Sequence, residues 1–226
     1  MLKFFSKYKF FAVVMFILSV IIMTTIYNLY KPEPRLKVYQ PNEFTKELVD
    51  STLQRVRKFH KIGDFKLVNQ YGDTISQTDF KDKIYITDFF FTTCQTICPV
   101  MTEHMEQIQE AFEDDDEIML LSHSVTPVID DVERLNKYAK EHNAIRDKWH
   151  LVTGDKKEIY RLARQSYFTT KTTGDGGKYD MVHTENFVLI DKEKRIRGTY
   201  DGTNPDEIEE AIEDIKILKQ EYKDQK

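Results

Sequence analysis

Cys94 and Cys98 are the only two cysteines of the chain, and they stand four residues apart. If both positions approach helical geometry, their Cα atoms are about 6 Å apart, near the upper end of the range that a disulfide spans. The same spacing lets two sulfurs bind one metal ion, because thiolates are ligands for soft metals. A third interpretation is a pair of buried, inert thiols. The spacing alone does not decide, and a metal site needs a further ligand elsewhere in the chain.

The segments on either side of the cysteines predict a strand followed by a helix. Residues 84–91 are β-branched and aromatic, which is typical of a buried strand. Pro99 suits the first residue of a helix, where its missing N–H costs nothing, and Met101, Met105 and Ile108 follow at helical spacing. Both thiols therefore lie beside a helix N-terminus, whose partial positive charge favours thiolate over thiol.

Six histidines are candidates for the missing partner. His104 lies on the predicted helix, but one turn beyond the sulfurs. His123 ends an apolar strand, and the carboxyl ends of strands in α/β sheets meet along one edge. His183 begins a strand directly after a glycine-bearing loop. The other three lie in polar segments and are expected at the surface: His60, His142 and His150. Composition alone leaves the choice between His123 and His183 open.

The rest of the chain alternates between strand and helix patterns. Such alternation predicts an α/β fold with a sheet dominated by parallel strands. Asp130 or Asp131, Asp155 and Asn204 are predicted to cap helices, since side-chain oxygens of this kind accept from the first free N–H groups. The predicted strands cover residues 64–68, 74–76, 117–125, 149–152, 183–191 and 195–200. Residues 168–182 contain three glycines and are predicted to form a mobile loop, and loops of this kind often carry function.

The first 30 residues predict a membrane anchor. Residues 10–30 contain no charged side chain, and at about 1.5 Å per residue they would span a bilayer core of roughly 30 Å. Lys3, Lys7 and Lys9 precede this segment and should stay in the cytoplasm, which places the following domain on the other side of the membrane. The segment ends in Thr-Thr-Ile-Tyr-Asn, a poor cleavage site for a signal peptidase, so we expect an uncleaved transmembrane helix.

The expected organisation is an anchor over residues 1–30, a proline-containing linker over 31–45 and one domain over 46–226. The chain has a formal net charge of −5, of which residues 1–30 contribute +3, leaving −8 for residues 31–226. An acidic domain argues against nucleic acid as a partner, since binding phosphates needs a basic face. It would suit a cationic partner or ion, although mild acidity often only confers solubility.

The motif around the cysteines resembles the signature of the SCO/SenC copper chaperones of cytochrome c oxidase assembly. The resemblance extends over about residues 62–218 and rests on four segments in the family's order: residues 88–99, 124–127, 183–191 and 200–203. It implies a thioredoxin-like domain, with a central mixed sheet flanked by helices, attached to an N-terminal transmembrane helix. The domain would face the periplasm or the mitochondrial intermembrane space. By residue-to-residue correspondence, it also implies that Cys94, Cys98 and His183 bind copper.

Three positions depart from the family's usual pattern. Gln95 stands where proline often follows the first cysteine, and Thr126 stands where aspartate is common. Val182 replaces the aspartate that usually precedes the histidine, while Asp180 lies two residues earlier. An acid before His183 could orient its ring, so this change bears on copper affinity or on partner docking rather than on the ligands themselves.

The resemblance implies a metallochaperone rather than an enzyme. Such a protein would bind one copper, Cu(I) or Cu(II), and assist assembly of the dinuclear copper site of a respiratory oxidase, with the copper-site subunit as its partner. The alternative is a thiol-disulfide oxidoreductase that uses Cys94 and Cys98 without metal. Thioredoxin-like oxidoreductases carry a cis-proline opposite their dithiol, whereas this chain has no proline between Pro127 and Pro205. A third interpretation is a binding module in which the two cysteines only crosslink the loop between them.

Overall fold

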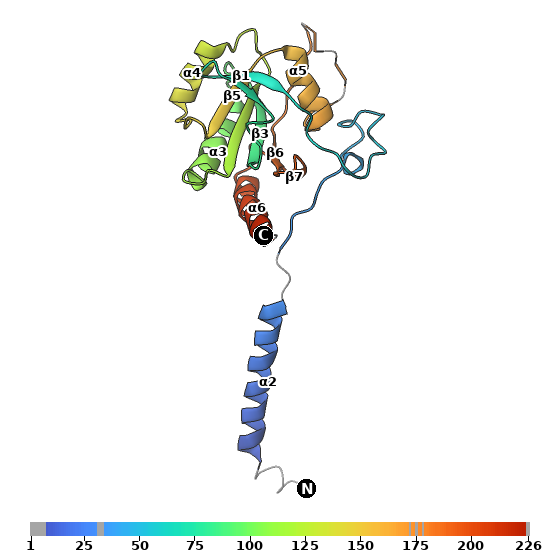
Figure 1. Cartoon of the computed structure of the whole chain (residues 1–226), viewed down its shortest axis with the longest axis vertical. Helices are drawn as coiled ribbons and strands as arrows, with labels where there is room; N and C mark the ends of the chain where they lie inside the picture. Colours follow the sequence, from blue (N-terminus) through green and yellow to red (C-terminus); the bar gives the residue numbers. More distant parts are fainter. Residues whose placement is uncertain (1–7, 31–33, 172, 175, 178, 225–226) are drawn as a thin grey trace. The chain divides into compact units, whose positions relative to one another are not determined.

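The computed structural model describes residues 8–30, 34–171, 173–174, 176–177 and 179–224 (Figure 1). Its contacts divide the chain into two compact units, Met1–Arg35 and Leu36–Lys226. The first unit contains the helix α2 (Lys9–Tyr30), as the uncharged segment predicts. Its portion Lys9–Tyr27 is long and apolar enough to cross a membrane, with a mean hydropathy of 2.5. The hydroxyls of Thr24 and Thr25 donate to the carbonyl of Ile21, so both find a partner within the helix.

The second unit is built on a seven-stranded sheet with the strand order β2-β1-β5-β4-β3-β6-β7. The strands are β1 (Lys66–Asn69), β2 (Thr74–Ser76), β3 (Ile84–Phe90), β4 (Ile118–Ser124), β5 (Trp149–Thr153), β6 (Asn186–Ile190) and β7 (Ile196–Asp201). Only the central strands β3, β4 and β5 run parallel to one another. The prediction of a sheet dominated by parallel strands is therefore wrong. Short turns join β1 to β2 and β6 to β7, and a short turn can connect only antiparallel neighbours.

Four helices flank this sheet: α3 (Cys98–Ala111), α4 (Val132–Glu141), α5 (Lys156–Arg161) and α6 (Pro205–Lys223). A π-helical segment, η2 (Leu162–Ser166), continues α5, and a short 3₁₀ helix, η1 (Pro41–Glu43), precedes β1. The predicted helix starts are confirmed, because Asp131, Asp155 and Asn204 each accept a hydrogen bond from a backbone N–H of the first turn. Figure 1 shows α3, α4 and α5 around the central strands.

Two apolar cores lie on opposite faces of the sheet. Helices α3, α4 and α6 cover one face, where Met101, Leu135 and Ile215 are fully buried together with Phe90 of β3. On the other face α5 and η2 pack over the alternate side chains of the same strands, among them Phe89. Successive side chains of a strand point to opposite faces. Neighbouring residues at the end of β3 therefore belong to different cores, which matters for the site described below.

The extended segment that begins at Leu36 is attached to the domain. The backbone N–H of Leu36 donates to the carboxylate of Glu221, and the guanidinium of Arg197 donates to the carbonyls of Leu36 and Lys37. The N–H of Tyr39 donates to the carbonyl of Ile196 over 2.9 Å. The part of the predicted linker from Leu36 onward therefore lies along β7 and α6, whereas residues 31–33 of that linker lie outside the described residues.

Candidate metal and redox site

The cysteines lie where the central strand β3 passes into α3. The strand ends at Phe90, a short loop carries Cys94, and Cys98 is the first residue of the helix. Cys94 is half-buried at the surface of the domain, whereas the side chain of Cys98 is buried in the core that α3 covers. The predicted strand and helix are confirmed, with the helix beginning one residue before Pro99. Both thiols are free, and each influences the pKa of the other.

The two thiols have opposite acidities. Partial burial would raise the pKa of Cys94, but hydrogen bonds from the Thr96 hydroxyl, from the N–H groups of Cys98 and Thr96, and from the Cys98 thiol outweigh this and lower it to about 7. Deeper burial, together with smaller contributions from the adjacent Cys94 sulfur and from Asp88, raises the pKa of Cys98 to about 12 despite a hydrogen bond with the Phe91 backbone that lowers it. The predicted preference for thiolate therefore holds for Cys94 alone. A metal ion that binds both sulfurs must displace the proton of Cys98.

We expect a thiol reagent to modify Cys94 selectively in the reduced protein. Alkylation proceeds through the thiolate, so its rate should rise with pH and reach half its maximum near pH 7, the pKa of Cys94. Cys98 should remain unmodified over the same interval, because its pKa is about 12 and its side chain is buried. Mass spectrometry of the alkylated chain measures both sites, and Cys94→Ser should remove the fast reaction. Equal rates at the two thiols would contradict the assignment.

His183 lies close to the cysteine loop, on the segment that leads into β6. Strand β6 runs antiparallel to β3, with Val188 opposite Thr87, so the start of β6 lies beside the end of β3. The His183 ring is exposed, and its centroid is 6.3 Å from that of Phe91. Phe91 follows β3, packs against both cores and accepts a hydrogen bond from the Cys94 N–H. The two cysteines and His183 are thus all neighbours of Phe91, the cysteines through its backbone and His183 through its ring.

The side chains are not gathered into one coordination shell. Among the residues that the structure describes, no group of three or more His, Cys, Asp or Glu side chains is close enough to hold a metal ion. The structure therefore brings Cys94 and Cys98 together and places His183 beside them at the surface. Three-ligand binding would require the exposed imidazole to move toward the sulfurs.

His123, the other candidate, is a core residue. It is fully buried and stacks on Phe89, with ring centroids 4.7 Å apart, and its Nδ1 lies 3.1 Å from the Thr87 hydroxyl. Burial lowers its pKa to about 4, so the ring is neutral at neutral pH. Phe89 belongs to the core on the face of the sheet opposite Cys98. The body of the sheet therefore separates His123 from the sulfurs.

The remaining histidines are held by other structural contacts. His150 is buried in β5, contrary to the expectation that it would be exposed, because every side chain of that strand is covered. His104 is buried, and its Nδ1 lies 2.7 Å from the carbonyl oxygen of Gly202. His60 and His142 are half-buried, beside the Ser166 carbonyl and the Glu106 carboxylate.

Asp88 is a site residue to which the sequence pattern assigned no role. It is buried in β3, and burial raises the pKa of its carboxyl to about 7, partly offset by a hydrogen bond with Ser122. One of its oxygens has no hydrogen-bond partner among the described residues. The charge of Asp88 also contributes to the raised pKa of Cys98. A carboxylate inside an otherwise apolar strand was the signal in the sequence that could have identified it.

A second buried carboxylate, Asp130, fastens the cysteine loop. It accepts hydrogen bonds from the N–H and the hydroxyl of Thr92, at 3.2 and 2.6 Å. The hydroxyls of Ser124 and Thr126 donate to it over 2.6 and 2.9 Å. The start of the cysteine loop is thereby tied to the turn that follows β4. The sequence left open whether Asp130 or Asp131 caps α4, and the structure shows that Asp131 does.

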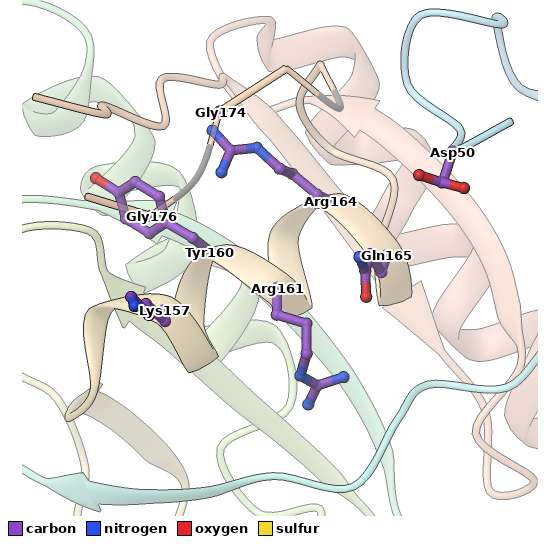
Figure 2. A pocket seen from close by; sticks show the side chains of 8 residues that line it. All are labelled: Asp50, Lys157, Tyr160, Arg161, Arg164, Gln165, Gly174 and Gly176. Atoms are coloured by element: carbon purple, nitrogen blue, oxygen red, sulfur yellow. The ribbon is translucent and has the colours of Figure 1, made fainter.

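An ion pair between Arg164 and Asp180 holds the loop that leads to His183. The two guanidinium nitrogens of Arg164 donate to the two oxygens of Asp180, each over 2.7 Å, and both side chains are about nine-tenths buried. Figure 2 shows the Arg164 side chain extending from the helix toward Gly174, beside a cavity of about 160 Å³. A Cβ at Gly174 would lie 2.5 Å from an Asp180 oxygen, so a larger residue would disturb the pair.

Breaking this ion pair should loosen the loop that carries His183. Arg164→Ala leaves a nearly buried carboxylate unpaired and should cost about 3 kcal/mol of unfolding free energy. The hydrogen bonds from Arg164 hold the pKa of Asp180 below its usual value, so the cost is present at neutral pH and disappears in acid. Denaturant unfolding and limited proteolysis within residues 171–183 measure the effect. Lys137→Ala removes an exposed pair with Glu141 and should cost less than about 0.5 kcal/mol; an equal loss in both variants would contradict the prediction.

Comparison with known proteins identifies the family. A family model described as SCO1/SenC matches residues 54–220. The chain is 29% identical over 159 residues to the SCO1 protein homolog of Bacillus subtilis, covering 70% of this chain and 82% of the relative. It is 26% identical over 155 residues to a SCO2-like protein of Rickettsia felis, covering 66% and 74%.

Solved structures agree with this result. A SCO1/SenC family lipoprotein from Bacillus anthracis is 29% identical with a TM-score of 0.62, covering 70% of this chain and 95% of that one. BsSco, described as a member of the Sco family of cytochrome c oxidase assembly proteins and as having a disulfide switch, is 28% identical with a TM-score of 0.57, covering 69% and 92%. Bradyrhizobium japonicum ScoI with copper bound, 24% identical with a TM-score of 0.56, shares the fold. The predicted thioredoxin-like fold is confirmed, and the chain belongs to the SCO1/SenC family.

Proposed function

We propose that this chain is a copper chaperone in which Cys94, Cys98 and His183 bind one copper ion as cargo. The observation that carries the proposal is the pair of thiols at the start of α3, with the exposed imidazole of His183 beside them around Phe91. Two thiolates and an imidazole suit copper in either oxidation state, whereas structural zinc usually takes four protein ligands. A relative described as a member of a family of cytochrome c oxidase assembly proteins supports the proposed destination.

The unequal thiols suggest an order of binding. Cys94 is partly exposed and, with a pKa of about 7, substantially ionised near neutral pH, whereas Cys98 is buried and protonated, so Cys94 would meet the incoming ion first. Cys98 then loses its proton to solvent as the metal binds, because a copper-bound sulfur is a thiolate. His183 closes the site from the exposed segment before β6, and its withdrawal leaves copper on two sulfurs that an acceptor can approach. The acceptor we propose is the subunit that holds the dinuclear copper site of a respiratory cytochrome c oxidase.

We further propose that α2 stays in the mature protein as an anchor and holds the domain on the extracytoplasmic, periplasmic side of a membrane. The apolar length of Lys9–Tyr27, and the lysines that precede it in the sequence, support this orientation. The family relationship also fits a membrane attachment, since a relative of known structure is described as a lipoprotein.

A second function has a specific observation in its favour. A thiol with a pKa near ambient pH is well suited to disulfide exchange, and Cys94 has such a pKa. The Cys94 thiolate would attack a partner disulfide and release one partner thiolate, and Cys98 would then attack Cys94 and release the second. The partner disulfide is reduced as the Cys94–Cys98 disulfide forms. Reduction of the acceptor's disulfide to thiols and delivery of copper to those thiols would then serve the same assembly step.

Oxidase maturation in the source organism tests the proposed function. Cells that lack the chain should lose most of their copper-dependent cytochrome c oxidase activity, and the wild-type chain should restore it. Cys94→Ser and Cys98→Ser should fail to restore it although the proteins accumulate, because each removes a ligand. Full oxidase activity in cells carrying either variant would show that the paired sulfurs are not the functional site.

A further inference from the structure

The segments that meet at the candidate site differ in charge from the rest of the chain. Residues 89–102, 118–129 and 181–184 contain no Asp, Glu, Lys or Arg, whereas such residues make up 31% of the chain. These segments carry the cysteine loop with the first turn of α3, the strand β4 with the turn after it, and the lead into β6. Three uncharged segments that are distant in sequence thus surround one site.

Hydrogen bonds hold these segments together. The Val125 N–H donates to the Phe90 carbonyl over 2.9 Å, so the chain after β4 continues beside the end of β3. The Tyr160 hydroxyl lies 3.0 Å from the Val125 carbonyl oxygen and 3.8 Å from the sulfur of Met181. Asp130 ties the same turn to Thr92 of the cysteine loop, as described above. The three segments are therefore tied to one another beside the cysteine loop.

Apolar side chains project from this surface into solvent. Their exposed fractions are 40% for Val100, 92% for Val128, 47% for Ile129 and 46% for Met181, and we call these four residues the apolar rim. Single exposed apolar residues are common, but a cluster around a reactive site is a feature of protein interaction surfaces. The centres of such surfaces are also depleted in charged residues.

We propose that the apolar rim is the docking surface for the copper acceptor, and that the acceptor presents an uncharged, apolar face around its own metal ligands. The proposal rests on the proposed function and specifies the partner's chemistry. Copper passes between proteins by exchange of ligands, so the acceptor must cover the surface next to Cys94 and His183, and the rim is that surface. Association should depend on apolar burial rather than on charge pairing, and therefore only weakly on ionic strength.

The test uses the full-length chain in detergent and, as probe, the purified copper-site domain of cytochrome c oxidase from the same organism. The rim variant is V128D/I129D, and the matched control is Phe59→Asp, which places a charge on a side chain that is 90% exposed elsewhere. Copper affinity should be the same in all three proteins. Association with the metal-free probe and the rate of copper transfer to it should both fall at least 10-fold in the rim variant, which is about the loss typical of replacing an interface anchor. In the control both should fall less than 2-fold.

The outcomes separate this proposal from the proposed function. Association is measured without copper, so a wild-type chain that binds no copper but binds the probe through the rim would refute the chaperone function and keep the docking surface. Equal association of wild type and rim variant would overturn the docking proposal while leaving copper binding intact. The docking proposal would also be overturned if the probe did not bind the wild type, if binding weakened steeply with salt, or if the rim mutations only dissociated a homodimer in sedimentation experiments.

Discussion

Replacing His183 with alanine should weaken copper binding more than 100-fold and leave the fold unchanged. Changes to groups that only orient a ligand typically cost about 10–100-fold in metal affinity, and loss of a direct ligand should cost more. The ring is exposed and contacts the ring of Phe91, so its removal opens no cavity in the core. Competition titration against a copper chelator, performed on the reduced chain, measures the effect.

The control for this experiment follows from the structure. His123→Ala is unsuitable, because its buried ring stacks on Phe89 and its loss would leave a cavity. His142 is half-buried beside Glu106, at the end of α4, so His142→Ala should retain wild-type affinity. The Cys94–Cys98 pair should still cycle between dithiol and disulfide in both variants, since exchange requires no imidazole. Wild-type copper affinity in His183→Ala would remove His183 from the ligand set.

Oxidation of Cys94 and Cys98 to a disulfide should abolish copper binding completely and reversibly. The metal requires thiolates, and a disulfide offers none. The two thiols are free and close enough to perturb each other's pKa, so we expect the bond to form with only local movement of the loop. Copper content is measured before oxidation, after oxidation verified by mass, and again after reduction.

A matched comparison makes this result specific. The same oxidant applied to Cys94→Ser should form no intramolecular disulfide, so a loss of folded structure in that variant would reveal oxidative damage elsewhere in the chain. Undiminished copper binding by the fully oxidised wild type would show that the sulfurs are not ligands.

The sequence was sufficient for features that depend on local chemistry. The apolar run before Cys94, the proline after Cys98 and the caps Asp155 and Asn204 each act within one or two turns of chain. Their strands and helix starts accordingly match the structure. The motif around Cys94 and the segment at His183 also sufficed to identify the family, which the match over residues 54–220 confirms.

Features that depend on which face of the sheet a side chain occupies could not be read from the pattern. His123 and His183 both lie at ends of strands, but only the sheet order places His183 beside the end of β3 and His123 in the opposite core. The difference in pKa between Cys94 and Cys98 arises in the same way, because burial of the Cys98 side chain in the core is the main cause of its raised pKa. Local helix position alone predicted equal thiols.

Pairings between distant residues were equally hidden. Arg164 and Asp180 are separated by a glycine-bearing loop that offers no periodic pattern to align them. Arg164 also lies in the π-helical segment η2, where the predicted regular helix changes its repeat and redirects its side chains. The sequence therefore located the loop before His183, while the structure shows what holds it.

The copper content of the full-length chain, purified in detergent under reducing conditions and loaded with copper, tests the proposed chaperone function most directly. We expect one tightly bound copper per chain in the wild type. We expect none in the double variant Cys94→Ser/Cys98→Ser, whose fold should be preserved because serine is close in size to cysteine. A wild-type chain that retained no more copper than the double variant, yet reduced protein disulfides, would contradict the chaperone function and identify the dithiol as a metal-independent oxidoreductase.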